Sequence, residues 1–103
     1  MSKIFDQDIF IKKNSAFLYK KLEDFLRTEI NDETFPIIYN FIRLENFRNG
    51  EFEGNQYLIQ KINPQDLQVI DIVSEEYVND ASQTRFKISV AEMIELLEEI
   101  NSK

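Results

Sequence analysis

The chain has 103 residues, of which 43% are hydrophobic and only two are glycine and two proline, so it is too apolar and too poor in breakers to be disordered. Its 12 basic and 19 acidic residues give a formal net charge of −7, which disfavours nucleic acid and anionic membranes as partners, because both attract lysine and arginine. The sequence contains no histidine or cysteine, which excludes the commonest general base, thiolate nucleophiles, disulfides and thiolate-bound metals.

These limits predict a single domain over residues 1–103 with one hydrophobic core. Met1 to Phe10 carries Asp6 and Asp8 where a signal peptide would have an apolar segment, and no long apolar run follows. We therefore expect a cytoplasmic protein without a membrane span. The lack of cysteine agrees with a reducing compartment.

The N-terminal region contains an irregular segment followed by a clearly patterned helix. Residues 1–13 fit neither the helical nor the strand period, and we predict a short strand or coil there. From Asn14 or Ser15 as N-cap, apolar residues recur on one helical face, which predicts a helix from Ser15 to about Ile30. That face comprises Leu18, Tyr19, Leu22, Phe25, Leu26 and Ile30.

Three apolar runs between Phe35 and Val73 predict an antiparallel meander that organises the rest of the chain. The first run, Ile37 to Arg48, is rich in residues that prefer strands and ends at Asn49-Gly50, a dipeptide typical of a type I′ hairpin turn. The expected register would pair Arg48 with Glu51, Phe47 with Phe52 and Asn46 with Glu53.

A helix is the alternative interpretation of the first run. It would begin with Thr34 as N-cap, hold Pro36 in its first turn and end with Gly50 as a left-handed residue after its C-terminus. The abundance of β-branched and aromatic side chains favours the strand.

Two further strands complete the predicted meander. Gln56 to Ile62 is the second, Asn63-Pro64-Gln65-Asp66 has the residue order of a type I turn, and Leu67 to Val73 is the third. Asp71 shares a face of the third strand with apolar side chains. A carboxylate with such neighbours must lie at an exposed edge or be paired.

The C-terminal part combines a polar connection, a short strand and a helix. Glu75 to Gln83 is the most polar connection in the chain, and Thr84 to Ile88 follows as a fourth strand. Ser89 and Glu92 form a capping box, so we predict a helix from Ser89 to Ile100. Its buried stripe comprises Val90, Met93, Ile94, Leu97 and Ile100.

These elements predict an α+β fold. An antiparallel sheet of three or four strands in meander order would have the N-terminal and C-terminal helices packed on one face. The glutamates of the last helix would then lie on its opposite, exposed arc.

The sequence holds no convincing catalytic or metal-binding motif. Neighbouring carboxylates are better explained as solvated charge than as the facing acids of a glycosidase. Gly50 and Gly54 enclose acids and lack the lysine of a phosphate-binding loop. Asp6 and Asp8 could ligate a hard cation, but no calcium-binding loop follows them. We expect no enzymatic activity, no cofactor and no metal site.

The acidity is concentrated in the C-terminal part of the chain. Lys61 to Lys103 carries four bases and nine acids, and the last helix has no lysine before Lys103 to pair with its glutamates. These acids serve either solubility or the docking of a basic partner. The residues predicted to contact a partner are Glu75, Glu76, Tyr77, Asp80, Glu92, Glu95 and Glu99.

We therefore expect a small acidic protein, not an enzyme, that binds a basic protein. An inhibitor or immunity protein that neutralises a nuclease is one such function. One alternative is a homodimeric structural or adaptor module that uses a sheet edge or spare apolar residues such as Phe17 and Phe47. The other is a small carboxylate-dependent enzyme or metal binder. Direct contact with nucleic acid or membrane is not expected.

Overall fold

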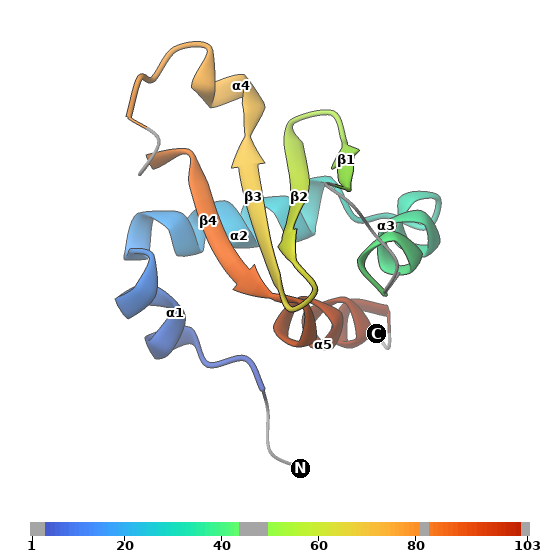
Figure 1. Cartoon of the computed structure of the whole chain (residues 1–103). Coiled ribbons are helices and arrows are strands. Elements are labelled where there is room, and N and C mark those ends of the chain that lie inside the picture. Colours follow the sequence, from blue (N-terminus) through green and yellow to red (C-terminus); the bar gives the residue numbers. More distant parts are fainter. Residues whose placement is uncertain (1–3, 44–49, 81–82, 102–103) are drawn as a thin grey trace.

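A computed structural model describes residues 4–43, 50–80 and 83–101 of the chain (Figure 1). The sheet has four antiparallel strands in meander order, which confirms the predicted α+β fold. No described helix is long and apolar enough to cross a membrane. In chain order, the elements are α1 (Gln7–Lys13), α2 (Ala16–Thr28), α3 (Thr34–Arg43), β1 (Glu51–Glu53), β2 (Tyr57–Asn63), β3 (Asp66–Asp71), α4 (Ile72–Glu75), β4 (Arg85–Ser89) and α5 (Val90–Asn101).

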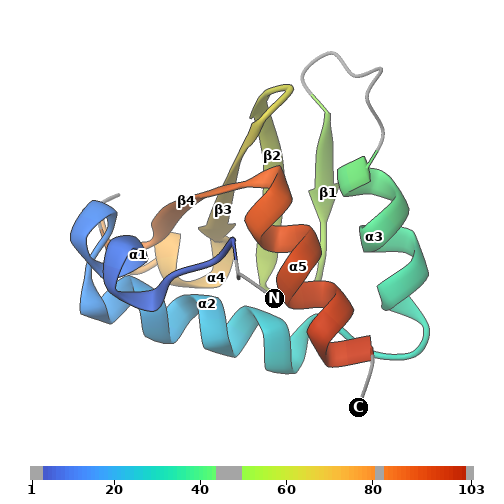
Figure 2. The ribbon, with the colours of Figure 1, turned by 90° about the horizontal axis from the view of Figure 1, so that it is seen from below.

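Helices α2 and α5 cover one face of the sheet, as predicted, and α3 stands beside β1 (Figure 2). Strand side chains alternate between the two faces, so each cross-strand row belongs to one face. The row that packs into the core consists of Phe52, Ile59, Val69 and Phe86. The core is completed from the helices by residues that include Leu18, Leu22, Phe25, Met93 and Leu97.

The two predicted terminal helices are confirmed together with their caps. Ser15 Oγ accepts a hydrogen bond from Leu18 N (3.0 Å) at the start of α2. At α5, Ser89 Oγ accepts from Glu92 N (3.0 Å), and Glu92 Oε1 accepts from Ser89 N (3.1 Å). These bonds satisfy amides that have no partner within the helix.

The strand predicted from Ile37 is wrong, because the chain forms helix α3 there. Asn31 Oδ1 accepts hydrogen bonds from the amides of Glu33 and Thr34 and so turns the chain into the helix. Ile38 and Ile42 lie one helical turn apart, are almost completely buried, and belong to the core cluster. This burial outweighs the strand preference of the individual residues.

The alternative helix is confirmed for its first part only. Helix α3 is described from Thr34 to Arg43, and the predicted continuation to Gly50 runs through residues 44–49, outside the described part of the chain. The predicted turn at Asn49 and the pairs that involve residues 46–48 lie outside the described residues. Strand β1 follows, and it pairs with β2 in the register Glu51 to Gln60 and Glu53 to Leu58.

The strand or coil predicted near the N-terminus is also wrong, because 7–13 is helix α1. Asp6 Oδ1 accepts hydrogen bonds from Asp8 N (2.9 Å) and Ile9 N (3.2 Å) and caps this helix. Only Phe10 of this helix is fully buried. A helix of two turns with one buried residue shows almost no hydrophobic periodicity in its sequence. Phe10 packs against Phe86 of the sheet with ring centroids 5.6 Å apart.

The remaining strands are confirmed, with one change at the end of β3. Asn63 Oδ1 accepts from the amides of Gln65 and Asp66 in the predicted turn between β2 and β3. Strand β3 ends at Asp71, two residues before the predicted Val73. The strand stops there because the Asp71 side chain caps α4.

A pair of neighbouring isoleucines tests helix α3. We expect Ile38→Ala to lower the free energy of unfolding by about 2–5 kcal/mol, because it leaves a cavity in the core. Ile37→Ala is the matched control, since Ile37 is 55% exposed, and should change stability by less than about 1 kcal/mol. Urea unfolding of both variants measures the difference, and equal losses would contradict the helix.

Candidate functional site

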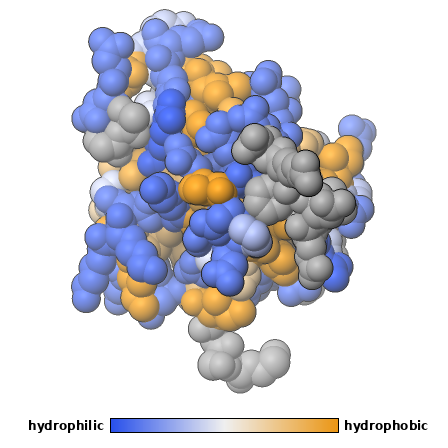
Figure 3. Space-filling model, viewed as in Figure 1, coloured by the Kyte–Doolittle hydropathy of each residue, from blue (hydrophilic) through white to orange (hydrophobic). Residues whose placement is uncertain are grey.

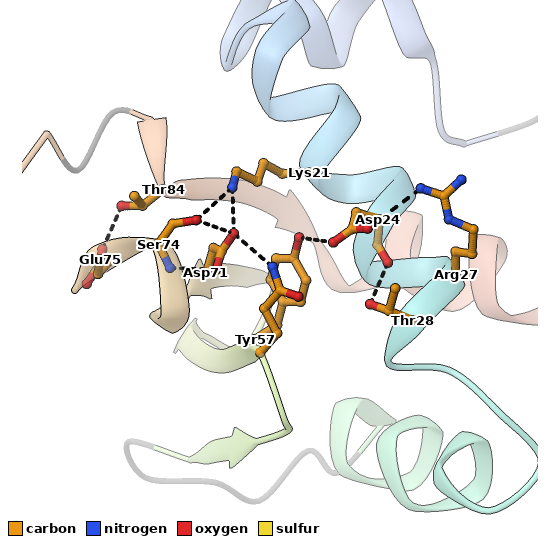
Figure 4. Close-up of polar contacts among 10 residues, drawn as sticks. Lys21, Asp24, Arg27, Thr28, Tyr57, Asp71, Ser74, Glu75 and Thr84 are labelled. Atoms are coloured by element: carbon orange, nitrogen blue, oxygen red, sulfur yellow. Dashed lines mark hydrogen bonds and ion pairs between the residues drawn. The ribbon is translucent and has the colours of Figure 1, made fainter. Parts of the chain in front are cut away.

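A buried carboxylate lies where β3 gives way to α4, and four polar groups surround it (Figure 4). Asp71 is completely buried and forms an ion pair with Lys21 of α2. Its carboxylate also accepts hydrogen bonds from Ser74 Oγ (2.8 Å), Ser74 N (3.0 Å) and Gln56 Nε2 (3.2 Å). Asp71 is therefore paired, as its apolar neighbours required. We call Lys21, Gln56, Asp71 and Ser74 the Asp71 anchor.

The surroundings of Asp71 keep its carboxylate charged. Burial alone would raise the pKa of Asp71, but hydrogen bonds from Lys21, Ser74 and Gln56 lower it below its usual range. Lys21 Nζ also donates to Ser74 Oγ (3.0 Å), so the Ser74 hydroxyl is oriented toward the carboxylate. The Asp71 anchor thus ties the start of α4 to α2 and to the residue before β2.

A second polar contact lies beside the anchor. Tyr57 is buried, and its hydroxyl donates to Asp24 Oδ2 (2.7 Å) of α2. Burial and this hydrogen bond raise the pKa of Tyr57. The Tyr57 ring packs edge-on against Phe25 with centroids 5.6 Å apart. A hollow of about 230 Å³ next to these residues is lined by Phe17, Lys20, Lys21, Asp24 and Tyr57.

The turn held by the anchor presents a largely exposed aromatic side chain. Tyr77 is 81% exposed and Val73 is 44% exposed. The backbone beneath them is ordered by hydrogen bonds from Tyr77 N (3.0 Å) and Val78 N (2.8 Å) to Ser74 O. Glu76 and Asp80 are exposed beside Tyr77 in the sequence. We call Val73, Glu76, Tyr77 and Asp80 the α4 surface.

Glu75, one of the residues predicted to contact a partner, has a structural role within the chain. Its carboxylate accepts from Nε of Arg85 (2.6 Å), the first residue of β4, and from Oγ1 of Thr84 (2.7 Å), the residue before it. The hydrogen bond from Arg85 is the main reason that the pKa of Glu75 is lowered. This pair fastens the end of α4 to the sheet.

The predicted acids of α5 are also engaged within the chain. Glu92 belongs to the capping box, and both carboxylate oxygens of Glu95 accept backbone hydrogen bonds from Ile4 N (2.8 Å) and Phe5 N (2.9 Å). Glu99 lines a hollow of about 290 Å³ together with Glu95, Phe5 and Tyr19. Glu92 and Glu95 accept hydrogen bonds from backbone amides, and such contacts leave no pattern of charges in the sequence. These acids lie apart from the α4 surface, on a helix at the other end of the sheet (Figure 1).

The described residues contain no group of three or more acidic side chains arranged to hold a metal ion. No protein-family model, curated protein or solved structure matches the chain. The α4 surface, which combines an exposed aromatic residue with acids on an anchored turn, is therefore the candidate site that its own geometry singles out.

The lowered pKa of Asp71 predicts that the stability of the fold depends on pH. The folded pKa of Asp71 is lowered, so its contribution to stability is present above the unfolded pKa of about 3.9 and is lost as the pH falls below it. At neutral pH, Asp71→Asn should lower the free energy of unfolding by about 3 kcal/mol, because Lys21 loses its charged partner.

The difference in the free energy of unfolding between the wild type and Asp71→Asn should shrink as the pH falls from about 5. Denaturant unfolding at several pH values measures this difference. Asp32→Asn, which changes an exposed loop carboxylate, is the matched control and should track the wild type. A difference that stays constant with pH would show that the carboxylate charge does not support the fold.

Proposed function

We propose that this chain is a non-enzymatic protein that binds a basic protein partner through the α4 surface and acts as an inhibitor. A basic target with a cationic active site, such as a nuclease, suits this role, as in an immunity protein. The observation that carries the proposal is the 81% exposure of Tyr77 on a turn fixed by a buried ion pair. A tyrosine side chain is usually partly buried, since its ring is apolar.

Preorganisation supports this surface as a binding site. A tyrosine has few side-chain torsions to immobilise, so it adds contact area at a small entropic cost. The α4 turn is already held through Ser74 and Glu75, and association therefore needs little further ordering. Tyrosine is also among the residues that most often dominate the energy of protein interfaces.

The charges of the surface favour a cationic partner. Glu76 directly precedes Tyr77, Asp80 follows three residues later, and the whole chain carries a formal charge of −7. Such a field accelerates encounter with a basic protein, and the local acids fix the orientation of the complex. A tyrosine and two acids placed over a cationic active site would exclude an anionic substrate. A cytoplasmic location fits this proposal, because a chain without cysteine has no need of an oxidising compartment.

Affinity capture from a lysate of the source organism tests the proposal. The wild-type chain should retain a basic protein that Tyr77→Ala loses, because the anchor side chain of the interface is gone. Phe17→Ala is the matched control, since Phe17 is an exposed aromatic residue on α2, and it should retain the same protein. Retention by both variants would exclude the α4 surface as the docking site.

The purified partner then separates the contributions of the ring and the charges. Tyr77→Ala should weaken binding by about 2 kcal/mol or more, mainly through faster dissociation. Glu76→Lys should slow association and reduce its dependence on salt. Glu33→Lys, a reversal of an exposed acid before α3, is the control for total charge. Identical association rates for the two reversals would show that only the net charge matters.

A further inference from the structure

The face of the sheet turned away from α2 and α5 carries a row of polar side chains across all four strands. The strand register places Glu51 opposite Gln60, Gln60 opposite Gln68, and Gln68 opposite Lys87. These residues alternate with the core row and therefore point to the opposite side. Figure 3 shows this face, on which hydrophilic residues surround separate apolar patches.

The charges of the row are self-complementary. When a second copy of the row is placed over the first in reverse order, an acid faces a base at each end. The row consists of an acid, an amide, an amide and a base, from the β1 edge to the β4 edge. A two-fold axis parallel to the strands, between β2 and β3, would place a second copy of the row on the first in reverse order. Glu51 of each copy would face Lys87 of the other, and Gln60 would face Gln68.

We propose that this face binds a second copy of the chain and forms a two-fold symmetric homodimer. Glutamine amides both donate and accept hydrogen bonds, so Gln60 and Gln68 can pair across the axis. Packed sheets lie about 10 Å apart, a gap that a lysine and a glutamate side chain can bridge together. The occupant follows from the charge pattern, because a wholly basic or wholly acidic partner would oppose one end of the row.

The charges at both ends of the row are placed for contacts between copies. Lys87 is exposed, and no carboxylate among the described residues pairs with its ammonium group. Glu51 is exposed at the opposite edge and accepts a hydrogen bond from Gln60 Nε2 (2.6 Å). The symmetric arrangement would give each charge a partner of opposite sign.

The surface around the row offers a recess and an apolar contact. A hollow of about 300 Å³ is lined by Gly50, Glu51, Gln60, Lys61, Ile62 and Gln68. It lies beside Glu51, where the aliphatic part of a lysine from the second copy would enter. Ile62 is 46% exposed there and would lose apolar surface to the interface.

Pairing through the β4 edge is opposed by Asn14. Its Nδ2 donates to Lys87 O (3.2 Å), and its Oδ1 accepts from Lys87 N (3.0 Å), so the side-chain amide occupies the backbone groups that a fifth strand would use. This contact favours association through the face of the sheet over the predicted sheet edge.

Charge reversal tests the dimer by sedimentation velocity at several protein concentrations in about 0.15 M salt. At this ionic strength the Debye length is about 8 Å, so the repulsion between two chains of charge −7 is largely screened. The wild type should shift from monomer to dimer as its concentration rises. Lys87→Glu alone and Glu51→Lys alone should each raise the dissociation constant about a hundredfold. Each lost ion pair is worth about tenfold, and the two-fold axis places two such pairs in every dimer.

The double variant Glu51→Lys with Lys87→Glu should recover the dimer, because the swapped charges again face each other. Lys20→Glu on α2 and Glu33→Lys before α3 repeat the two charge changes elsewhere and should dimerise like the wild type. Circular dichroism verifies that every variant is folded. A wild type that stays monomeric, single reversals without effect, or a double variant no better than the single ones would each overturn the proposal.

Discussion

The ion pair between Asp71 and Lys21 is the contact on which the arrangement of this molecule depends. A fully buried carboxylate is tolerated only with enough donors around it, and here they come from α2, from α4 and from Gln56, the residue before β2. The same carboxylate ends β3 and caps α4. One side chain thus fixes the position of the helix layer against the sheet and the direction in which the chain leaves the sheet.

The parts of the fold that the sequence predicts correctly are those with local signals. Ser15 and the pair Ser89 and Glu92 act on amides within one helical turn, and Asn63 closes its own turn. Helix α3 fails this rule, because its strand-preferring residues become helical through long-range burial of Ile38 and Ile42. No local pattern reports how much room the neighbouring elements leave for a helix.

For the candidate site, too, the sequence predicts the local features but not the long-range contacts. The polar connection after β3 and the position of Tyr77 within it are visible in the sequence, and so is the need for Asp71 to be paired. The partner of Asp71 is not, because Lys21 lies 50 residues away on an element whose rotation only the packed core determines. The structural use of Glu95 was hidden for a similar reason, since backbone amides leave no trace in a charge pattern.

The two proposed surfaces are compatible and have a joint consequence. The α4 surface lies beyond the end of β3, whereas the polar row crosses the face of the sheet (Figure 1). A two-fold axis parallel to the strands leaves direction along the strands unchanged, so both α4 surfaces of a dimer would lie at the same end. Such a dimer would engage two sites on one target, or two copies of it, and the second contact would form at a high effective concentration. A modest affinity at each Tyr77 would then suffice for tight inhibition of a dimeric target, whereas a monomeric target would gain nothing from the second surface.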